Sequence, residues 1–486
     1  MPNKISWLEW SKESFEKAKV ENKPILLDIH GVWCHWCHIM DKTSYDDKEI
    51  IDIINKNFVP IKVDTDKRPD INKRYNQGGW PSTVFLTQTG QIITGATYLP
   101  PELMKDLMFK VIEVFKIIKI NEPEFEIKNQ KIENANIDKK IIDKIMENML
   151  ANFDFDFGGF GIFPKFPAAD AIKLAFNQYK KTKNKDFLVI AKLTLDNMGG
   201  IFDKIEGGFY RYSVTQQWNE PHYEKMLETN AGVIENYLQG YEIMEKEEYK
   251  EMAEKSLSYV NNNLSNKDGA FYGSQDADED YYKLSIEERK MHKNPFTDKN
   301  IYTDFNSMMI GAYACAFKVL NNHYYKDFAL VSIQFLLKNN YQKNFGMFHH
   351  FDGKNKFLPG ILADNIYFIK ALLDVFEITK DKKILEESEK LTKFVIENFI
   401  DKETNCFFDK TINPDDMGFL RFRDKPLMEN SVMAINLIRL SKLNNKKSYL
   451  KNAENIIEFF NSEYEKYSFH EAIYALAVEE FLDLKN

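Results

Sequence analysis

The sequence lacks the features that would mark a secreted, membrane or nucleic-acid-binding protein. Only 4 cysteines occur among 486 residues, too few for a disulfide framework. There is no run of about 18 apolar residues and no apolar signal-peptide core near the start. The net charge of −9 gives no basic surface for nucleic acid or anionic membranes. We therefore predict a cytoplasmic protein with neither nucleic acid nor membrane as a partner.

What is abundant is aromatic and helix-forming sequence. Aromatic residues make up 14% of the chain, with 38 Phe and 24 Tyr, which predicts large cores or an aromatic-lined pocket. Hydrophobic residues at 44% and charged residues at 29% are ordinary for a soluble globular protein. A length of 486 residues allows about two to four domains.

Two of the four cysteines form the most specific chemical motif. Cys34 and Cys37 follow an apolar run at 25–29 that predicts a buried strand. We expect a helix to open at Cys34, where the positive end of the helix dipole favours a thiolate. Cys37, one turn later, can close a disulfide. The pattern is typical of a thioredoxin-like redox site.

Three other interpretations of this cysteine pair stay open. Zinc needs about four ligands and a second Cys pair is absent, although His30, His35 and His38 could contribute. The Cys-His-Trp-Cys-His run at 34–38 also fits covalent haem attachment, which usually follows export. Two unreactive buried thiols are the third interpretation. We predict no metal and no cofactor.

The residues around the pair resemble thioredoxin. Asp28, Trp33, Cys34 and Cys37 fall where thioredoxins carry a buried Asp, a Trp and the two cysteines. The segment 79–85 resembles the one that holds thioredoxin's cis-proline, which would be Pro81. The alternative for Pro81 is an ordinary proline at the start of a strand.

This resemblance implies a role for each residue. Cys34, expected to be the more exposed sulfur, would attack as a thiolate, and Cys37 would resolve the mixed disulfide. Asp28, if buried, would have a raised pKa and could take the proton of Cys37; otherwise it is a solvent-facing strand end. His35 should make the couple more oxidising, and Trp80 could narrow the groove for a polypeptide substrate.

The chain divides into an α/β part and a helical part. Residues 1–120 predict a thioredoxin fold, because helical and strand patterns alternate in the expected order. Residues 121–137 are polar and predict a linker. Residues 138–486 contain about twelve amphipathic helical stretches, punctuated by Gly-aromatic turns near 158, 207, 269 and 346, with a degenerate fifth near 405. Six helical hairpins closed in a ring, an (α/α)6 barrel, are favoured over an open superhelical array.

The loops between these helices carry polar groups beside aromatic residues, a combination that suits sugar binding. The predicted ligand-binding residues of the barrel are Arg211, His222, Glu224, Asp276, Asp278, Asp304, Asn306, Asp364, Glu429 and Asn430. Each has a structural alternative as well. Asp304 and Glu429 fit helix N-terminal acids, the 276–280 run fits a solvated turn, and His222 fits a core histidine.

Both parts together resemble a family that fuses a thioredoxin-like domain to a six-hairpin glycosidase-like barrel and includes the spermatogenesis-associated thioredoxin-like proteins. The motifs that carry this resemblance are at 34–40, 61–64, 68–70, 77–81, 207–213, 221–227 and 275–278. The resemblance implies a barrel like that of N-acylglucosamine 2-epimerases. The Asp-Phe-Asn-Ser run at 304–307 departs from the Ser-Trp-Asn-Gly typical of the family, and Asp28 and Trp33 are closer to true thioredoxin.

Four functions are consistent with these features. The first is a thiol-disulfide oxidoreductase fused to a barrel that binds a small carbohydrate-like ligand, with a protein redox partner possible. The second is a sugar epimerase or isomerase, with His222, His349, His350 and His470 as acid–base candidates. The third is a glycoside hydrolase with paired carboxylates. The fourth is a binding protein whose thioredoxin-like domain is a docking module.

Overall fold

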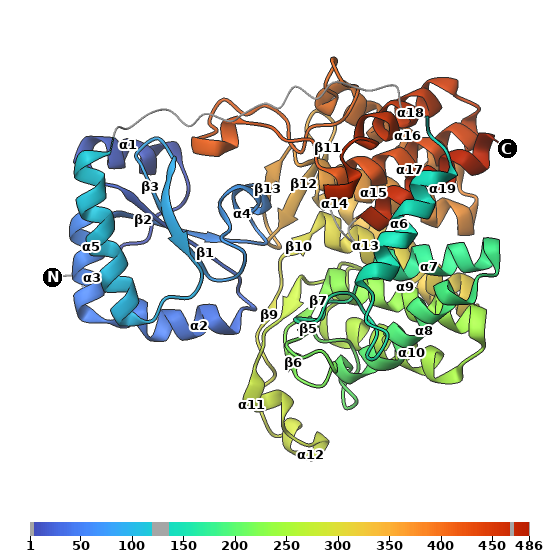
Figure 1. The fold of residues 1–486 in the computed structure, drawn as a ribbon, viewed down its shortest axis with the longest axis horizontal. Helices are drawn as coiled ribbons and strands as arrows, with labels where there is room; N and C mark the ends of the chain where they lie inside the picture. The colour runs from blue at the N-terminus through green and yellow to red at the C-terminus, as the bar shows by residue number, and fades with distance from the viewer. Residues whose placement is uncertain (1–3, 119–135, 467–470, 486) are drawn as a thin grey trace. The chain divides into compact units, whose positions relative to one another are not determined.

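A four-stranded sheet forms the centre of one unit of the chain, and packed helices form most of the other (Figure 1). The structure is a computed structural model that describes residues 4–118, 136–466 and 471–485. The first unit comprises residues 1–129 and 412–423, and the second comprises residues 130–411 and 424–486. No helix among the described residues is long and apolar enough to cross a membrane.

The sheet of the first unit has the strand order β2-β1-β3-β4. Its strands are β1 (Ile25–His30), β2 (Val59–Asp64), β3 (Ser82–Leu86) and β4 (Ile92–Ala96). β1 pairs with β2 in parallel and with β3 antiparallel, and β3 pairs with β4 antiparallel. This topology confirms the predicted thioredoxin fold.

Helices cover both faces of this sheet. They are α1 (Lys12–Glu21), α2 (His35–Lys42), η1 (Ser44–Asp46), α3 (Lys48–Asn57), α4 (Pro69–Tyr75) and α5 (Pro101–Ile117). Side chains alternate along β1, so that Ile25, Leu27 and Ile29 pack in the core with α1 and α4. Leu26 packs in the other core, with α2, α3 and α5. Asp28 alternates with Leu27 and Ile29, and therefore points to the face that α2 covers.

The first unit also includes a segment from far along the chain, residues 412–423. Met417 and Leu420 are buried in the same core as α1 and α4, and the Tyr75 hydroxyl accepts a hydrogen bond from Phe419 N at 2.8 Å. The predicted domain bounds, 1–120 and 138–486, do not assign residues 412–423 to the first unit. Contacts between residues more than 300 positions apart leave no local pattern in the sequence. The predicted linker, 121–137, lies almost wholly outside the described residues.

The second unit contains twelve helices of 14 or more residues within its described part. They are α6 (Lys139–Asn152), α7 (Ala169–Thr182), α8 (Lys185–Met198), α9 (Leu227–Met244), α10 (Glu247–Asn263), α13 (Thr303–Leu320), α14 (His323–Asn339), α15 (Leu362–Thr379), α16 (Lys382–Phe399), α17 (Leu427–Asn444), α18 (Lys447–Phe460) and α19 (Ala472–Lys485). Contacts run in the order α7, α9, α13, α15, α17, α19 and back to α7. The inner helices therefore close a ring. The (α/α)6 barrel is confirmed, and the open array is excluded.

Short elements connect the hairpins. They are η2 (Gly199–Ile201), β5 (Tyr212–Ser213), β6 (Pro221–His222), β7 (Lys225–Met226), β8 (Ser274–Gln275), α11 (Glu279–Tyr282), α12 (Ile286–Arg289), β9 (Thr297–Asp298), β10 (Ile301–Tyr302), β11 (Tyr341–Gln342), β12 (Gly346–Phe351), β13 (Lys356–Pro359) and η4 (Tyr464–Lys466). A further short helix, η3 (Gly418–Arg421), belongs to the first unit.

A repeated asparagine clamp joins four of the five Gly-aromatic turns to the next inner helix. Asn306, at the fourth position of α13, accepts a hydrogen bond from Phe271 N at 2.8 Å and donates to Phe271 O at 2.9 Å and Tyr302 O at 2.8 Å. The equivalent clamps are Asn230, Asn365 and Asn430. The turns need a left-handed residue, which is Gly269 at φ 94° in the third turn and Asn405 at φ 59° in the fifth. The degenerate fifth turn is thus a true repeat.

Candidate functional site

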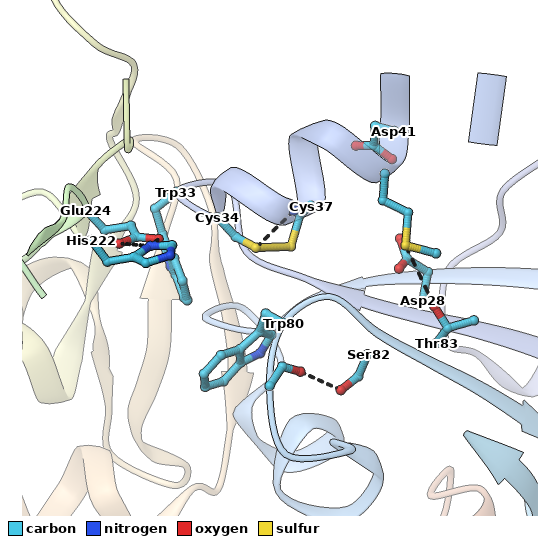
Figure 2. Close-up of a disulfide and its surroundings, with 12 residues drawn as sticks. Asp28, Trp33, Cys34, Cys37, Asp41, Trp80, Ser82, Thr83, His222 and Glu224 are labelled. Carbon is cyan, nitrogen blue, oxygen red and sulfur yellow. Dashed lines mark hydrogen bonds and ion pairs between the residues drawn. A yellow bond between two sulfur atoms is a disulfide. The ribbon is translucent and has the colours of Figure 1, made fainter. Parts of the chain in front are cut away.

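The cysteine pair of the first unit is a disulfide at the start of α2 (Figure 2). Cys34 is the N-cap residue of α2, and its Sγ accepts a hydrogen bond from Cys37 N at 3.2 Å. Both cysteines are 3% exposed, so the expected greater exposure of Cys34 is not seen. Position distinguishes the two sulfurs instead, because only Cys34 lies at the positive end of the helix dipole.

Asp28 is buried in β1, as predicted, with 1% of its surface exposed. Burial raises its pKa to about 6, and the positive charge of Lys62 limits that rise. Lys62 Nζ lies 3.2 Å from Asp28 Oδ2 and 2.6 Å from Asp41 Oδ1. Sequence reasoning missed Lys62 and Asp41. The register that places Lys62 in β2 directly beside Asp28 in β1 appears only when the strands are paired.

The Trp80–Pro81 peptide bond is cis, as predicted. The Trp80 indole donates a hydrogen bond to Asn72 Oδ1 at 3.2 Å, and its ring meets that of Trp33 edge-on at 5.6 Å. Trp33 in turn donates to Asp66 Oδ2 at 2.7 Å. Two tryptophans near the cysteines are thus fixed in orientation by polar partners.

In the barrel, His349 lies close to two carboxylates, one buried and one half-buried. His349 Nδ1 in β12 lies 2.9 Å from Asp364 Oδ1 in the first turn of α15, and both residues are buried. Asp304, in the first turn of α13, offers an oxygen within 4.8 Å of the other two groups. Burial raises the pKa of Asp304 to about 6; His349 opposes this rise and the charge of Asp364 adds to it. The structure therefore brings Asp304 and Asp364 together with His349.

A second histidine–carboxylate pair lies before α9. His222 Nδ1 is 2.9 Å from Glu224 Oε1, and the Tyr212 ring stacks on the imidazole at 4.6 Å between centroids. Burial and the charge of Glu224 raise the pKa of Tyr212 to about 12, and Arg211 opposes them. His222, Glu224 and Arg211 therefore form a local cluster around Tyr212.

Glu228, which sequence reasoning missed, links this cluster electrostatically to Asp304. Burial raises the pKa of Glu228 to about 7, while Arg211 lowers it and Asp304 raises it. The signal was available, because Glu228 precedes the clamp residue Asn230 by two positions, as Asp304 precedes Asn306.

Glu228 and Asp304 are part of a wider pattern. Each inner helix carries an acid in its first turn or immediately before it: Asp170, Glu228, Asp304, Asp364, Glu429 and Glu471. The charges of Asp170, Glu429 and Asp304 all act on the half-buried Tyr367 of α15. The N-terminal ends of the inner helices therefore carry a strongly acidic set of side chains.

Other predicted ligand-binding residues have structural contacts. The carboxamides of Asn306 and Asn430 are engaged by backbone in the clamps described above. Asp278 is exposed and caps α11 by accepting from Tyr281 N at 3.0 Å. Asp276 lies in the same loop, where its own N–H donates to Phe296 O at 2.8 Å. We leave these four out of the proposed site. His470 lies outside the described residues.

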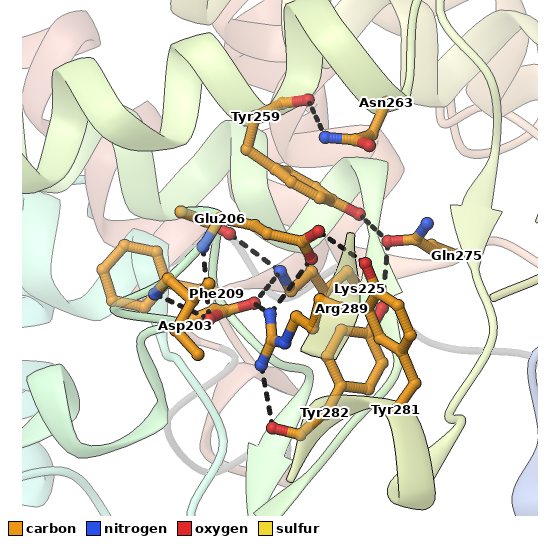
Figure 3. A network of polar contacts seen from close by, with 12 residues as sticks. Asp203, Glu206, Phe209, Lys225, Tyr259, Asn263, Gln275, Tyr281, Tyr282 and Arg289 are labelled. Atoms are coloured by element: carbon orange, nitrogen blue, oxygen red, sulfur yellow. Dashed lines mark hydrogen bonds and ion pairs between the residues drawn. The ribbon is translucent and has the colours of Figure 1, made fainter. Parts of the chain in front are cut away.

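A buried ion network joins the segment between α8 and α9 to the segment between α10 and α13 (Figure 3). Lys225 Nζ lies 2.7 Å from Asp203 Oδ2, and Arg289 reaches the same oxygen at 2.8 Å. Burial lowers the pKa of Lys225 to about 8. A similar pair lies between α6 and α7, where Lys165 Nζ is 2.7 Å from Asp154 Oδ2. Lys165 also donates to Gly158 O and so holds a Gly-aromatic turn. Such repetition indicates a structural role.

Comparisons with known proteins agree with the two folds. Residues 1–144 match the Thioredox_DsbH family model, described as a protein of unknown function, DUF255. The chain is 36% identical over 310 residues to the uncharacterized protein B0495.5 of Caenorhabditis elegans, covering 57% of this chain and 42% of that protein. It is 32% identical over 311 residues to human spermatogenesis-associated protein 20, covering 57% of this chain and 39% of that protein. The chain thus spans about two fifths of the length of these curated relatives.

Similar folds occur among solved structures. A D-mannose isomerase superposes with a TM-score of 0.58 at 14% identity, covering 72% of this chain and 100% of that protein. The cellobiose 2-epimerase of Spirochaeta thermophila superposes with a TM-score of 0.58 at 12% identity, covering 72% and 96%. At this identity the likeness concerns the fold alone.

A sequence relative of the first unit is thioredoxin-1 of Drosophila melanogaster. It is 30% identical over 76 residues, covering 16% of this chain and 68% of thioredoxin-1.

Proposed function

Because the chain belongs to the family that joins a thioredoxin-like domain to a six-hairpin glycosidase-like barrel, we propose that its first unit catalyses thiol–disulfide exchange through Cys34 and Cys37. The observation that carries this proposal is the cysteine pair closed across the first turn of α2, with a buried Asp28 in the strand that leads into it. Cytoplasmic thiols would supply the reductant.

The exchange follows from the position of each group. The Cys34 thiolate attacks one sulfur of a substrate disulfide, and the other substrate sulfur leaves as a thiolate. Cys37 then attacks Cys34 Sγ, which closes the protein disulfide and releases the second substrate thiol. Asp28 points to the α2 face of the sheet and, with a pKa of about 6, is suited to accept the Cys37 proton near neutral pH. The substrate is reduced by two electrons and the cysteine pair is oxidised by two.

Small disulfides provide the direct test of this activity. We expect the full chain to reduce glutathione disulfide or an aromatic disulfide, and Cys34→Ser to abolish the reaction. The matched control is the Cys315→Ser/Cys406→Ser double variant, which removes the two other thiols and should keep full activity. Unchanged activity in Cys34→Ser would refute the proposal.

For the barrel, we propose binding of a carbohydrate-like ligand and proton transfer on it, as in an epimerase or isomerase. The supporting observation is the His222–Glu224 pair, because a carboxylate that holds one imidazole nitrogen fixes the tautomer and the orientation of the ring. His222 is the candidate base that removes a proton beside a carbonyl. Glu228, whose pKa of about 7 keeps it partly protonated, is the candidate acid that returns one.

Inverting glycoside hydrolysis by Asp304 and Asp364 is disfavoured. Their nearest carboxylate oxygens lie within 4.8 Å, whereas inversion needs carboxyl groups roughly 6.5–9.5 Å apart.

Incubation of aldoses and ketoses in deuterated water separates isomerisation from hydrolysis. Solvent deuterium at the carbon beside the carbonyl, lost in His222→Gln, supports isomerisation. Release of reducing ends from oligosaccharides without such exchange would show hydrolysis instead.

A further inference from the structure

We propose that Asp304, His349 and Asp364 form a binding site for a divalent transition-metal ion in the barrel. This site goes beyond the proton transfer assigned to His222 and Glu228. The sequence predicts Asp304 and Asp364 as ligand-binding residues and His349 as an acid–base candidate, but no metal, since the three residues come from separate segments of the chain.

The spacing of the three groups suits one ion. His349 Nδ1 and Asp364 Oδ1 are 2.9 Å apart, and Asp304 offers an oxygen within 4.8 Å of both groups. Nitrogen and oxygen ligands lie about 2.0–2.2 Å from a metal such as zinc, so neighbouring ligands are about 3–3.5 Å from each other. The first two groups are close to this spacing, and the Asp304 oxygen would have to move nearer to them to complete the set.

The three side chains are held by elements that pack against each other. Asp304 and Asp364 lie in the first turns of the adjacent inner helices α13 and α15. His349 lies in β12, which contacts both helices and pairs with β10 immediately before α13. His349 and Asp364 are 1% and 0% exposed. A site on packed helices and a paired strand is pre-organised and needs no folding of a loop to form.

The charge balance near the site favours a cation. Asp304 interacts electrostatically with Asp364 and with Glu228, and Arg211 offsets part of the negative charge on Glu228. One oxygen of Glu228 is buried and accepts no hydrogen bond from any described residue. Buried carboxylates so close together are costly unless a positive charge compensates them. A divalent ion bound by Asp304, His349 and Asp364 would supply that charge.

The ligand set narrows the choice of ion. Two carboxylates and one imidazole suit Zn²⁺, Mn²⁺ or Fe²⁺, whereas Ca²⁺ and Mg²⁺ prefer oxygen ligands alone. Three protein ligands leave at least one coordination position for water or for an oxygen of a bound ligand. The site would therefore hold polyhydroxylated compounds by their oxygens.

Metal binding can be measured without knowledge of the substrate. The full chain, treated with chelator and carrying Cys34→Ser/Cys37→Ser to remove the other thiol pair, is titrated with Zn²⁺ and Mn²⁺ by calorimetry. Mass spectrometry of the equilibrated protein gives the stoichiometry. We expect one ion per chain. Asp304→Asn, which keeps the side-chain shape, and His349→Gln should each weaken binding at least about tenfold, because each removes a ligand.

The matched control is His222→Gln, which alters the other histidine–carboxylate pair and should bind metal as the parent does. Circular dichroism and the unfolding temperature show whether each variant is folded. If His349→Gln unfolds, Asp304→Asn alone decides the outcome. Absence of stoichiometric binding of either ion, or equal affinity in Asp304→Asn and the parent, overturns the proposal. His349 would then be a hydrogen-bonded partner of Asp364 only.

Discussion

Replacing Asp28 with asparagine should stabilise the first unit at neutral pH and lose that effect in acid. The pKa of this carboxyl rises from 3.8 to about 6 on folding, mainly through burial. One pKa unit corresponds to about 1.4 kcal/mol, so keeping Asp28 ionised costs the folded state about 3 kcal/mol above pH 7. The Asp28→Asn substitution removes this cost, and Lys62 keeps Asp41 as its partner at 2.6 Å.

The sign of the pH dependence follows from proton binding. Between pH 6 and 4, the folded protein holds a proton on Asp28 that the unfolded chain releases, so wild-type stability rises as the pH falls. The advantage of Asp28→Asn should therefore be about 3 kcal/mol at pH 8 and close to zero near pH 4.

Urea unfolding of the oxidised full chain, followed by tryptophan fluorescence, measures this difference. Five of the six tryptophans lie in the first unit: Trp7, Trp10, Trp33, Trp36 and Trp80. The signal therefore reports mainly on the unit that contains Asp28. As a control, Asp41→Asn removes the more exposed partner of Lys62 and should change stability by less than about 1 kcal/mol. Equal differences at pH 8 and pH 4, or a less stable Asp28→Asn at pH 8, would refute the reasoning.

Three further predictions test other parts of the molecule. Cys37→Ser should accumulate a mixed disulfide with substrate thiols on Cys34, seen as an added mass that reductant removes; no adduct counts against Cys34 as the nucleophile. Leu420→Ala should destabilise the first unit by about 2–5 kcal/mol in the fluorescence assay, whereas Ile412→Ala, 77% exposed, should not. In Asn306→Ala, buried backbone groups lose their hydrogen-bond partners, which costs the folded state about 1–3 kcal/mol for each group. Calorimetry should therefore show a lower unfolding temperature for the barrel, and an unchanged temperature would contradict the role of the clamp.

The parts of the fold that the sequence predicts are those with local signals. The apolar run at 25–29 and the helical periodicity of the barrel segments place most elements within a few residues of their observed bounds. The Cys34–Cys37 pair is equally local, because both residues belong to one helical turn. The twelve helical stretches similarly predict six hairpins, and the Gly-aromatic turns mark five of the junctions between them.

What the sequence does not predict depends on pairing between distant segments. Asp28 acquires Lys62 through strand register, and His349 acquires Asp364 through the packing of β12 against α15. Residues 412–423 pack in the first unit although they follow a barrel helix. The sequence predicts ligand binding by Asn306 because an amide in a loop-facing turn suits sugar. Its backbone partners become visible only when the turn and the helix are in place.

The reduction potential of the Cys34–Cys37 couple tests the central claim most directly. The full chain carrying Cys315→Ser/Cys406→Ser is equilibrated across a glutathione series, the free thiols are alkylated, and the intact mass is measured. The account predicts one two-electron transition between about −120 and −270 mV, the range of working oxidoreductases. A pair that stays reduced throughout the series, or a disulfide that glutathione never opens, would contradict a role in thiol–disulfide exchange.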